Sequence, residues 1–162
     1  MANPEDLKKL TTLTDWARWR ESNPYIVPDL RDAKFDEAYL NGIDFSRCIL
    51  RGASFNDTEL KGANFLDADI SFADFHGSML IEANFSNTQM VDTNFSHANL
   101  KGARFVKVES SQTNFTGAKL TNVSILESRL DFSIFDGADI SDSQIELSTF
   151  FGTFFFQTIV KN

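Results

Sequence analysis

Five-residue periodicity is the feature of this chain that most limits its possible folds. From Leu30 to Val160 the sequence divides into 27 consecutive units of five residues without an insertion or a deletion, and the central position of each unit is large and apolar except at Ser110. The position two residues before the centre is Ala, Ser, Thr or Cys in every unit except four. The exceptions are Pro28, Ile43, Val108 and Val123. All eight glycines lie two residues after a centre, which random placement would produce roughly once in 10⁵ trials, so the units form a true internal repeat.

The period excludes the two common regular structures. An amphipathic helix places apolar residues three or four apart, and a flat strand alternates every two residues. A period of five instead fits an extended segment of about three residues followed by a tight turn, with the centre and the small residue before it on the inner side. Glycine two residues after the centre fits the third position of a type II turn, which needs a positive φ. Asp57, Asp67 and Asn87 share this position, because Asp and Asn tolerate such a φ.

Residues twenty apart carry the same kind of side chain, which indicates how many units close one coil. One column of centres holds phenylalanine alone, namely Phe35, Phe55, Phe75, Phe95, Phe115, Phe135 and Phe155. A second column is aliphatic throughout, namely Leu40, Leu60, Leu80, Leu100, Leu120, Ile140 and Val160. The columns favour four units in a coil, although the alternation of phenylalanine and leucine around the circuit also fits a ten-residue repeat.

The segments "GANF", "HANL", "GARF" and "GAKL" follow the pattern A-(D/N)-L-x-x, and in this the sequence resembles the pentapeptide-repeat family over residues 28–162. The resemblance implies an all-β solenoid, a right-handed quadrilateral β-helix of nearly seven coils with a short N-terminal helical cap. Each coil would take about 20 residues and stack on the next at about 4.8 Å, giving a rod on the order of 30 Å long. We therefore expect a helical cap at 1–27 and the β-helix at 28–162.

The first 27 residues are suited to covering one of the two open edges that a solenoid exposes. Asn3, which precedes a proline, predicts a helix start, and Thr12 with Asp15 predicts a second start in a weaker form of the capping box. Trp16 and Trp19 lie three residues apart and therefore share a helix face. The side chains that we expect to cover the first coil are Leu7, Leu10, Trp16 and Trp19.

The stretch "LKKLTTLTDWARWRESNPYIVPDL" resembles the Leu-rich, Trp-x-x-Trp-Arg, Asn-Pro segment that precedes the repeats in many bacterial members of the family. Ala17 stands where those members have Asn after the first Trp, and the glycine between the leucines and the Trp pair is absent. These departures concern the turn, and the resemblance implies the same capping role.

The C-terminal end has no helix signal and carries aromatic residues at outward positions instead. Phe151, Phe154 and Phe156 lie in the last coil with Ile159 nearby, which is more than the usual scatter of apolar side chains on a surface. They could fold over their own coil as a lid, or they could join two copies end to end. We favour the homodimer, because a two-fold contact covers both open edges at once. The resemblance supports it, since several members of the family are known to dimerise at this end.

One unit of the repeat, "VKVES", breaks both rules of the pattern. Val108 places a large residue in the small position, and Ser110 places a small polar residue at the centre. We interpret the pair as local volume compensation, because close packing passes a change of volume from one coil to the next. Ser110 then needs a buried hydrogen-bond partner.

No group of residues in the sequence has the arrangement of an active site, because a filled rod without a long insertion holds no pocket. His76 and His97 fall on neighbouring coils of one face, but with Asp57 or Asp74 they fix no third metal ligand, and we interpret them as surface residues. Cys48 occupies a small inward position, which indicates a buried and inert thiol. We expect a protein that is not an enzyme, with no catalytic residue, no metal and no cofactor.

Composition limits the remaining partners. The 23 acidic and 15 basic side chains give a net charge of −8, so direct contact with nucleic acid is not expected. The N-terminus lacks a secretory signal, and the most apolar stretch, "STFFGTFFFQTIV", is too short and too polar to cross a bilayer. We expect a cytoplasmic protein with no membrane contact.

A protein partner is the leading hypothesis. An outward column contains Leu66, Val106 and Leu126, and Met79 and Ile81 lie on the adjoining face, so the five residues are a candidate docking stripe. The sequence therefore favours a non-enzymatic scaffold or protein–protein interaction module whose partner is an unidentified protein.

The alternative is a DNA mimic that binds DNA gyrase or topoisomerase IV, as the best-known members of the family do with an acidic rod. Mimicry needs acids that recur along one face at the spacing of phosphates. The outward column that contains Asp29 and Asp69 also contains Ile49 and Arg129, which interrupt the row of acids. No outward column is acidic throughout. The projecting loops of the quinolone-resistance relatives are also missing, so we rank this function second.

Overall fold

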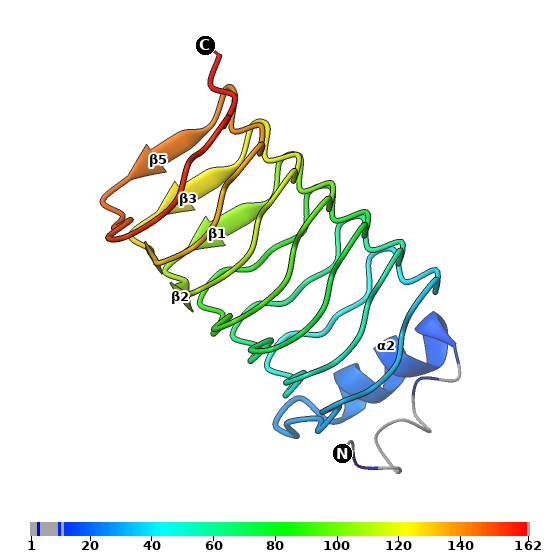
Figure 1. Cartoon of the computed structure of the whole chain (residues 1–162). Helices are drawn as coiled ribbons and strands as arrows, with labels where there is room; N and C mark the ends of the chain where they lie inside the picture. Colours follow the sequence, from blue (N-terminus) through cyan, green and yellow to red (C-terminus); the bar gives the residue numbers. More distant parts are fainter. Residues whose placement is uncertain (1–2, 4–9, 11, 162) are drawn as a thin grey trace.

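The fold was analysed in a computed structural model, which describes Asn3, Leu10 and residues 12–161. The repeat winds into a β-helix in which each extended segment pairs in parallel with the segment twenty residues later, from Asp29 opposite Ile49 to Asp139 opposite Ile159. A coil therefore takes four units, as the columns of centres predicted, with a turn at each of its corners. Figure 1 shows the coils stacked along a rod, with the N-terminal helix at one end and the C-terminus at the other.

The chain is an all-β solenoid with a short N-terminal helix, α2, at Leu13–Ser22. Most extended segments pair through single bridges, and only the later coils contain strands of three residues. These strands are β1 (Arg104–Val106), β2 (Glu109–Ser111), β3 (Ser124–Leu126), β4 (Arg129–Asp131) and β5 (Gln144–Glu146). They form a parallel sheet in the order β1-β3-β5 and a parallel pair β2-β4. The handedness, the number of coils and the domain boundary between 27 and 28 stay predictions.

The residue two after each centre turns the corner, as predicted. Every such residue from Asp32 to Gln157 has a positive φ, and the eight glycines all have values from 65° to 71°. Glycine is needed on steric grounds at Gly152, because an added Cβ would lie 2.6 Å from the ring of Phe132 in the preceding coil. A side chain at this corner therefore leans over the same corner of the next coil, and glycine makes room for it.

The interior of the rod contains two columns of phenylalanine rings in contact. Within a column the rings stack, as Phe55 and Phe75 do with centroids 4.6 Å apart and planes at 1°. Between columns they meet edge to face, as Phe55 and Phe65 do at 6.1 Å and 90°. Each such pair adds about 0.5–1.5 kcal/mol beyond the burial of its area. One column continues to Phe155, whereas the other ends at Phe105 and is followed by Ile125 and Ile145.

Hydroxyl groups in the small position join one coil to the previous one. The Oγ1 atoms of Thr58 and Thr93 each donate to a centre's carbonyl 23 residues earlier, at 2.8 and 3.0 Å. Ser128 goes further, because its Oγ donates to the carbonyl of Phe105 and accepts from the N–H of Val108. At other corners the N–H of the small position donates directly to the carbonyl of the preceding centre, as Ala103 does to Leu100. Here the hydroxyl of Ser128 lies between the two groups instead, and the corner between β1 and β2 is open.

The irregular unit fits inside the rod, and its interpretation as volume compensation stays a prediction. Val108 and Ser110 are both buried. The Oγ of Ser110 lies 2.6 Å from Oγ1 of Thr113, which in turn donates to the carbonyl of Met90 at 2.7 Å. The predicted buried partner of Ser110 is therefore the hydroxyl of the next small position.

Candidate interaction surfaces at the two ends of the rod

The first coil presents backbone carbonyls that have no preceding coil to bond them, and α2 supplies donors to two of these carbonyls. In the second coil the carbonyls of Asn64 and Leu66 each accept a backbone N–H of the first coil, at 2.8 Å. The equivalent carbonyls of the first coil belong to Asp44 and Ser46. They accept from Nε1 of Trp16 and from Nη2 of Arg20, both at 2.7 Å. Two side chains of one helix thus continue the bonding pattern of the coils.

Helix α2 begins as the sequence predicted. The N–H of Asp15 donates to Oγ1 of Thr12 at 3.0 Å, and the Thr12 hydroxyl donates back to Oδ2 of Asp15 at 2.7 Å. Trp16 is buried and stacks on the half-buried Trp19 with centroids 5.4 Å apart. Leu10 also packs against the core, whereas Leu7 and the first predicted helix lie outside the described residues.

Arg20 is the residue at this end that sequence reasoning missed. Its side chain is only 6% exposed, and its Nε donates to Oδ2 of Asp44 at 3.3 Å in addition to the contacts of Nη2 with Ser46. The signal was present in the Trp-x-x-Trp-Arg segment, whose arginine follows directly after the second Trp. The pattern alone could not tell which carbonyls that arginine would serve.

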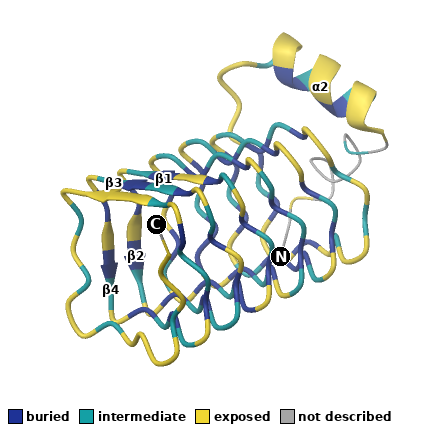
Figure 2. Cartoon of the chain, turned by 90° about the horizontal axis from the view of Figure 1, so that it is seen from above, coloured by how far each residue is buried: buried dark blue, intermediate teal, exposed yellow. Residues whose placement is uncertain are grey.

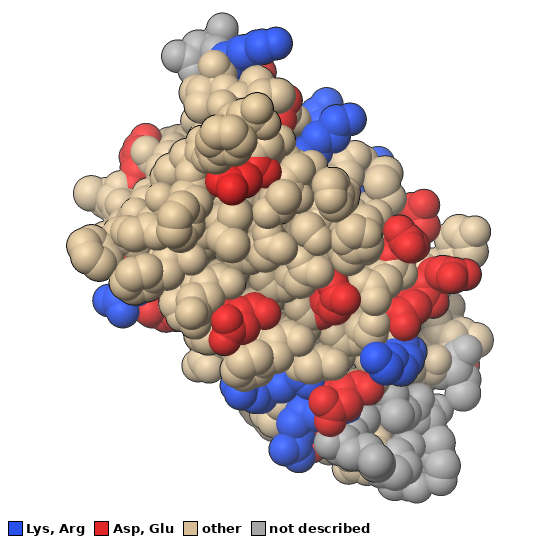
Figure 3. All heavy atoms as spheres, in the orientation of Figure 1, with Lys and Arg blue, Asp and Glu red and all other residues tan. Residues whose placement is uncertain are grey.

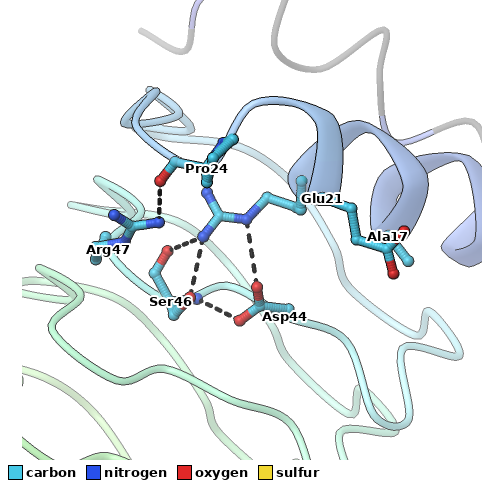
Figure 4. A pocket seen from close by; sticks show the side chains of 7 residues that line it. Ala17, Glu21, Pro24, Asp44, Ser46 and Arg47 are labelled. Carbon is cyan, nitrogen blue, oxygen red and sulfur yellow. Dashed lines mark hydrogen bonds and ion pairs between the residues drawn. The ribbon is translucent and has the colours of Figure 1, made fainter.

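A pocket of about 270 Å³ lies beside the contact between α2 and the first coil (Figure 4). It is lined by Ala17, Arg20, Glu21, Pro24, Asp44, Ser46 and Arg47. Arg47 donates from Nη2 to the carbonyl of Pro24, and Asp44 and Ser46 are occupied by Arg20. The polar groups around the pocket therefore hold α2 against the coil, and none of its lining residues is a nucleophile with an adjacent base.

The opposite end of the rod differs, because no helix covers the last coil within residues 12–161. The centres of this coil lack a following layer. Phe155 is 44% exposed, whereas Phe95 in the same column is fully buried. In the preceding coil Phe135 and Gly137 donate their N–H groups to carbonyls of the last coil, at 2.8 Å. The structure describes no acceptor for the equivalent N–H groups of Phe155 and Gln157, so the edge is open.

We call the uncovered surface of this coil the end face; the sequence predicted an open edge here but not the residues that form it. Its exposed apolar centres are Ile145, Phe155 and Val160. The five-residue pattern places these residues inside, and that is correct only where another coil follows. Figure 2 shows the result, since exposed residues predominate in the last coil and the inner walls of the earlier coils are buried.

The aromatic residues predicted as the C-terminal interface are exposed but lie mainly on one side of the rod. Phe151, Phe154 and Phe156 project from two neighbouring corners and the segment between them. Ile159 is also exposed, on a different side. The sequence analysis treated the exposed apolar residues of the last coil as one surface. The structure divides them between the end face and the sides of the rod.

The candidate docking stripe on the middle coils is less exposed than its residue types suggested. Each of its members, Leu66, Met79, Ile81, Val106 and Leu126, is half-buried. Corner side chains lie along the next coil, which covers part of them. The stripe stays a prediction.

The two histidines form a pair on the surface. Their ring centroids are 5.5 Å apart, and Nδ1 of His76 lies 2.9 Å from Oγ of Ser96. Among the described residues, no group of three or more His, Cys, Asp or Glu side chains is placed to hold a metal ion. Cys48 is buried, in the small inward position that the repeat assigns to it.

Side chains of both charges lie on the surface of the rod. Figure 3 shows acidic side chains scattered over the visible face, with Lys and Arg mainly near its edges. Nη2 of Arg31 lies 2.6 Å from Oδ2 of Asp29, and this hydrogen bond lowers the pKa of the aspartate. A hydrogen bond with Ser141 likewise lowers the pKa of Asp139. Over residues 12–161, no helix is long and apolar enough to span a bilayer.

Comparison with known sequences and structures agrees with this architecture. The sequence profile of pentapeptide repeats matches residues 29–65, 68–105 and 111–150, with eight copies. A trypsin-treated variant of QnrB1, a plasmid-mediated fluoroquinolone resistance protein, is 15% identical over 82% of each chain, with a TM-score of 0.54. The pentapeptide repeat protein alr5209 from Nostoc Pcc 7120 is 26% identical over 59% of this chain and 79% of its own, with a TM-score of 0.51. No curated protein sequence matches the chain.

Proposed function

Because the chain belongs to the pentapeptide-repeat family, we propose that it is a non-enzymatic module that binds another protein through a side or an end of its rod. The observation that carries the proposal is the contrast between a filled interior and an exposed apolar C-terminal region. Stacked rings occupy the axis of the rod, so a small molecule has no interior site there. The apolar side chains at the C-terminal end lie on a rigid scaffold, as partner-binding residues do.

The test is direct capture of a partner followed by reconstitution. The full chain is immobilised, proteins from the native host are captured and identified, and each candidate is purified and titrated by calorimetry. We expect one candidate to bind saturably with a defined stoichiometry. Failure of every purified candidate to bind would overturn the proposal. Elemental analysis of the pure protein checks its non-enzymatic part, because a stoichiometric metal would reopen the question of catalysis.

We further propose that two copies of the chain associate through the end face. The edge of the last coil offers a donor, the N–H of Phe155, and an acceptor, the carbonyl of Thr153. In the preceding coil the carbonyl equivalent to that of Thr153 belongs to Ser133, and it accepts a backbone N–H at 3.0 Å. An edge with donors and acceptors can pair with its own copy in an antiparallel manner across a two-fold axis. Sedimentation equilibrium of the wild type and of Val160→Asp measures this, and a monomeric wild type at high micromolar concentration would contradict it.

The second candidate function is a DNA mimic that binds DNA gyrase or topoisomerase IV. The net charge of −8 and the fold shared with a fluoroquinolone resistance protein favour it. The lack of an outward column that is acidic throughout weighs against it, as does the unbroken five-residue spacing between 30 and 160, which leaves no projecting loop. A gyrase supercoiling assay separates the two functions. Neither inhibition nor protection of gyrase at micromolar concentration would remove the mimic.

A further inference from the structure

We propose that one side of the last two coils is a docking site for a segment of another protein that carries an aromatic or aliphatic anchor flanked by Lys or Arg. The proposal rests on the role as an interaction module and names the surface and the chemistry of its partner. We call this surface the lateral aromatic patch, and it consists of Phe132, Ile134, Phe151, Phe154 and Phe156.

The members of the lateral aromatic patch are neighbours in space. Ile134 and Phe154 face each other in the parallel pairing of the two coils. The rings of Phe132 and Phe151 meet edge to face at one corner, with centroids 5.4 Å apart. Phe156 stands at the next corner of the same side. The patch is thus distinct from the end face, and pairing of two copies at their ends would leave it accessible.

The size of the patch favours a short segment over a second copy. Its four phenylalanines are between 50% and 73% exposed. At about 200 Å² for a whole ring side chain, they expose on the order of 500 Å². That is near the upper end of what a monomer usually exposes in one patch. It falls short of the roughly 800 Å² that each partner contributes to a stable protein–protein interface, so the patch alone is better matched to a peptide-sized partner.

Phe132 provides independent support. It sits at a corner with a φ of 59°, a backbone conformation that a bulky residue adopts at a cost of roughly 1–2 kcal/mol. Phe72 occupies the same kind of corner, but the guanidinium of Arg51 covers its ring at 5.0 Å. Phe132 and Phe72 are equally exposed, at 50% and 51%, but the group that meets the ring of Phe132 is the apolar ring of Phe151 instead of a guanidinium. A strained and exposed aromatic ring is explained if a partner buries it.

The charge of the same side specifies what flanks the anchor. This side comprises residues 31–37 and 51–57, which carry Arg31, Lys34 and Arg51, and residues 71–77, 91–97, 111–117, 131–137 and 151–157, which contain neither Lys nor Arg. The acidic residues of these five later coils are Asp74, Asp92, Asp131 and Asp136. The only guanidinium described near the patch is that of Arg129 on the adjoining side, whose Nε lies 3.9 Å from Asp131 and whose Nη1 lies 3.6 Å from Glu109. A basic partner segment therefore meets an acidic surface on this side.

Two of these carboxylates are held in place at the rim of the patch. Oδ1 of Asp131 accepts the N–H of Phe151, and Oδ1 of Asp136 accepts the N–H of Phe156, each at 2.9 Å. Fixed carboxylates on both flanks of an aromatic surface are suited to Lys or Arg on both flanks of an apolar anchor. Lys and Arg of the partner are thus expected within a few residues of the anchor.

The experiment selects peptides without assuming their sequence. A display library of random twelve-residue peptides is selected on the immobilised full chain at low salt. We expect enriched peptides to combine an aromatic or aliphatic residue with neighbouring Lys or Arg. Their affinity should fall about thirty-fold or more in the double variant Phe151→Ser with Phe154→Ser, as for the loss of a central anchor. The control Phe72→Ser changes a corner outside the patch and should leave binding unchanged.

Three outcomes would overturn the docking site. They are no enrichment over uncoated support, enrichment of peptides without Lys or Arg, and binding that survives the double variant when far-ultraviolet circular dichroism shows the variant folded. Sedimentation gives a further check, because a dimer that dissociates in the double variant would make the patch a self-interface. A captured host protein that binds wild type and double variant equally would preserve the interaction module and reject only this surface.

Discussion

The two ends of the rod are built from the same repeat but are finished in opposite ways. At the N-terminal end Trp16 and Arg20 of α2 donate to the edge carbonyls of Asp44 and Ser46. At the C-terminal end the last coil exposes Phe155 and edge N–H groups for which no acceptor is described within residues 12–161. Ten residues of helix are therefore enough to supply donors to two edge carbonyls of the first coil. The uncovered edge is the one at which we propose that two copies pair, and the four predictions below test the contrast between the two ends.

The largest effect should follow from breaking the covered end. Replacing Trp16 by Ala removes a buried ring and leaves the carbonyl of Asp44 without its donor. We expect the free energy of unfolding to fall by about 3–5 kcal/mol in urea titrations. Trp19→Ala, at a half-buried neighbour, is the matched control and should have a clearly smaller effect. Equal losses for the two variants would contradict the covering role of Trp16.

A second comparison uses one column at two depths of the rod. Phe95 is fully buried and Phe155 is 44% exposed, although both occupy equivalent positions. Phe95→Ala should reduce the free energy of unfolding by about 3–5 kcal/mol, and Phe155→Ala by about 2 kcal/mol less than that. If the end face joins two copies, the effect of Phe155→Ala will grow with protein concentration, and measurement at two concentrations distinguishes these cases.

Arg20 should contribute less than Trp16 but more than an exposed arginine of the same helix. Arg20→Met keeps much of the side-chain volume while it removes the donors to Asp44 and Ser46, so we expect a loss of about 1–3 kcal/mol in the free energy of unfolding. Arg18 makes only an exposed pair with Asp15. Arg18→Met should therefore change stability by no more than about 0.5 kcal/mol. If Arg20→Met lowered the free energy of unfolding by no more than Arg18→Met, water would be replacing the hydrogen bonds of Arg20 with Asp44 and Ser46.

The smallest effect concerns pH. The pKa of Asp29 is lowered by Arg31 and the pKa of Asp139 by Ser141, so each carboxylate is more acidic folded than unfolded. A lowered pKa stabilises the fold above the unfolded value of about 3.9, and this contribution disappears as pH falls through the folded value. Unfolding midpoints measured from pH 5 to pH 2 should therefore decrease less steeply in Ser141→Ala than in the wild type. An unchanged slope would exclude the hydrogen bond as the cause.

The sequence predicts those parts of the fold and of the candidate sites that repeat every five or twenty residues, and it does not predict those that depend on the ends of the repeat. The core centres and the corner turns follow from a period of five, because each unit has the same neighbours as the units twenty residues away. Arg20 and the end face could not be predicted in this way, since they depend on where the repeat stops. Val106 and Leu126 of the docking stripe pair in one column, as the twenty-residue spacing predicted, but Leu66 and Val106 are half-buried. The pattern carries no information about that.

The fixed pairing of residues twenty apart also governs how a chain of this kind can change length. Adding or deleting twenty residues leaves every column intact and moves one end of the rod by a single step of about 4.8 Å. Deleting five residues rotates all later coils by a quarter turn relative to α2 and stacks phenylalanine centres on leucine centres. A surface such as the lateral aromatic patch can therefore be re-aimed in four directions, and set nearer to or farther from the helix, without a change in any residue that forms it.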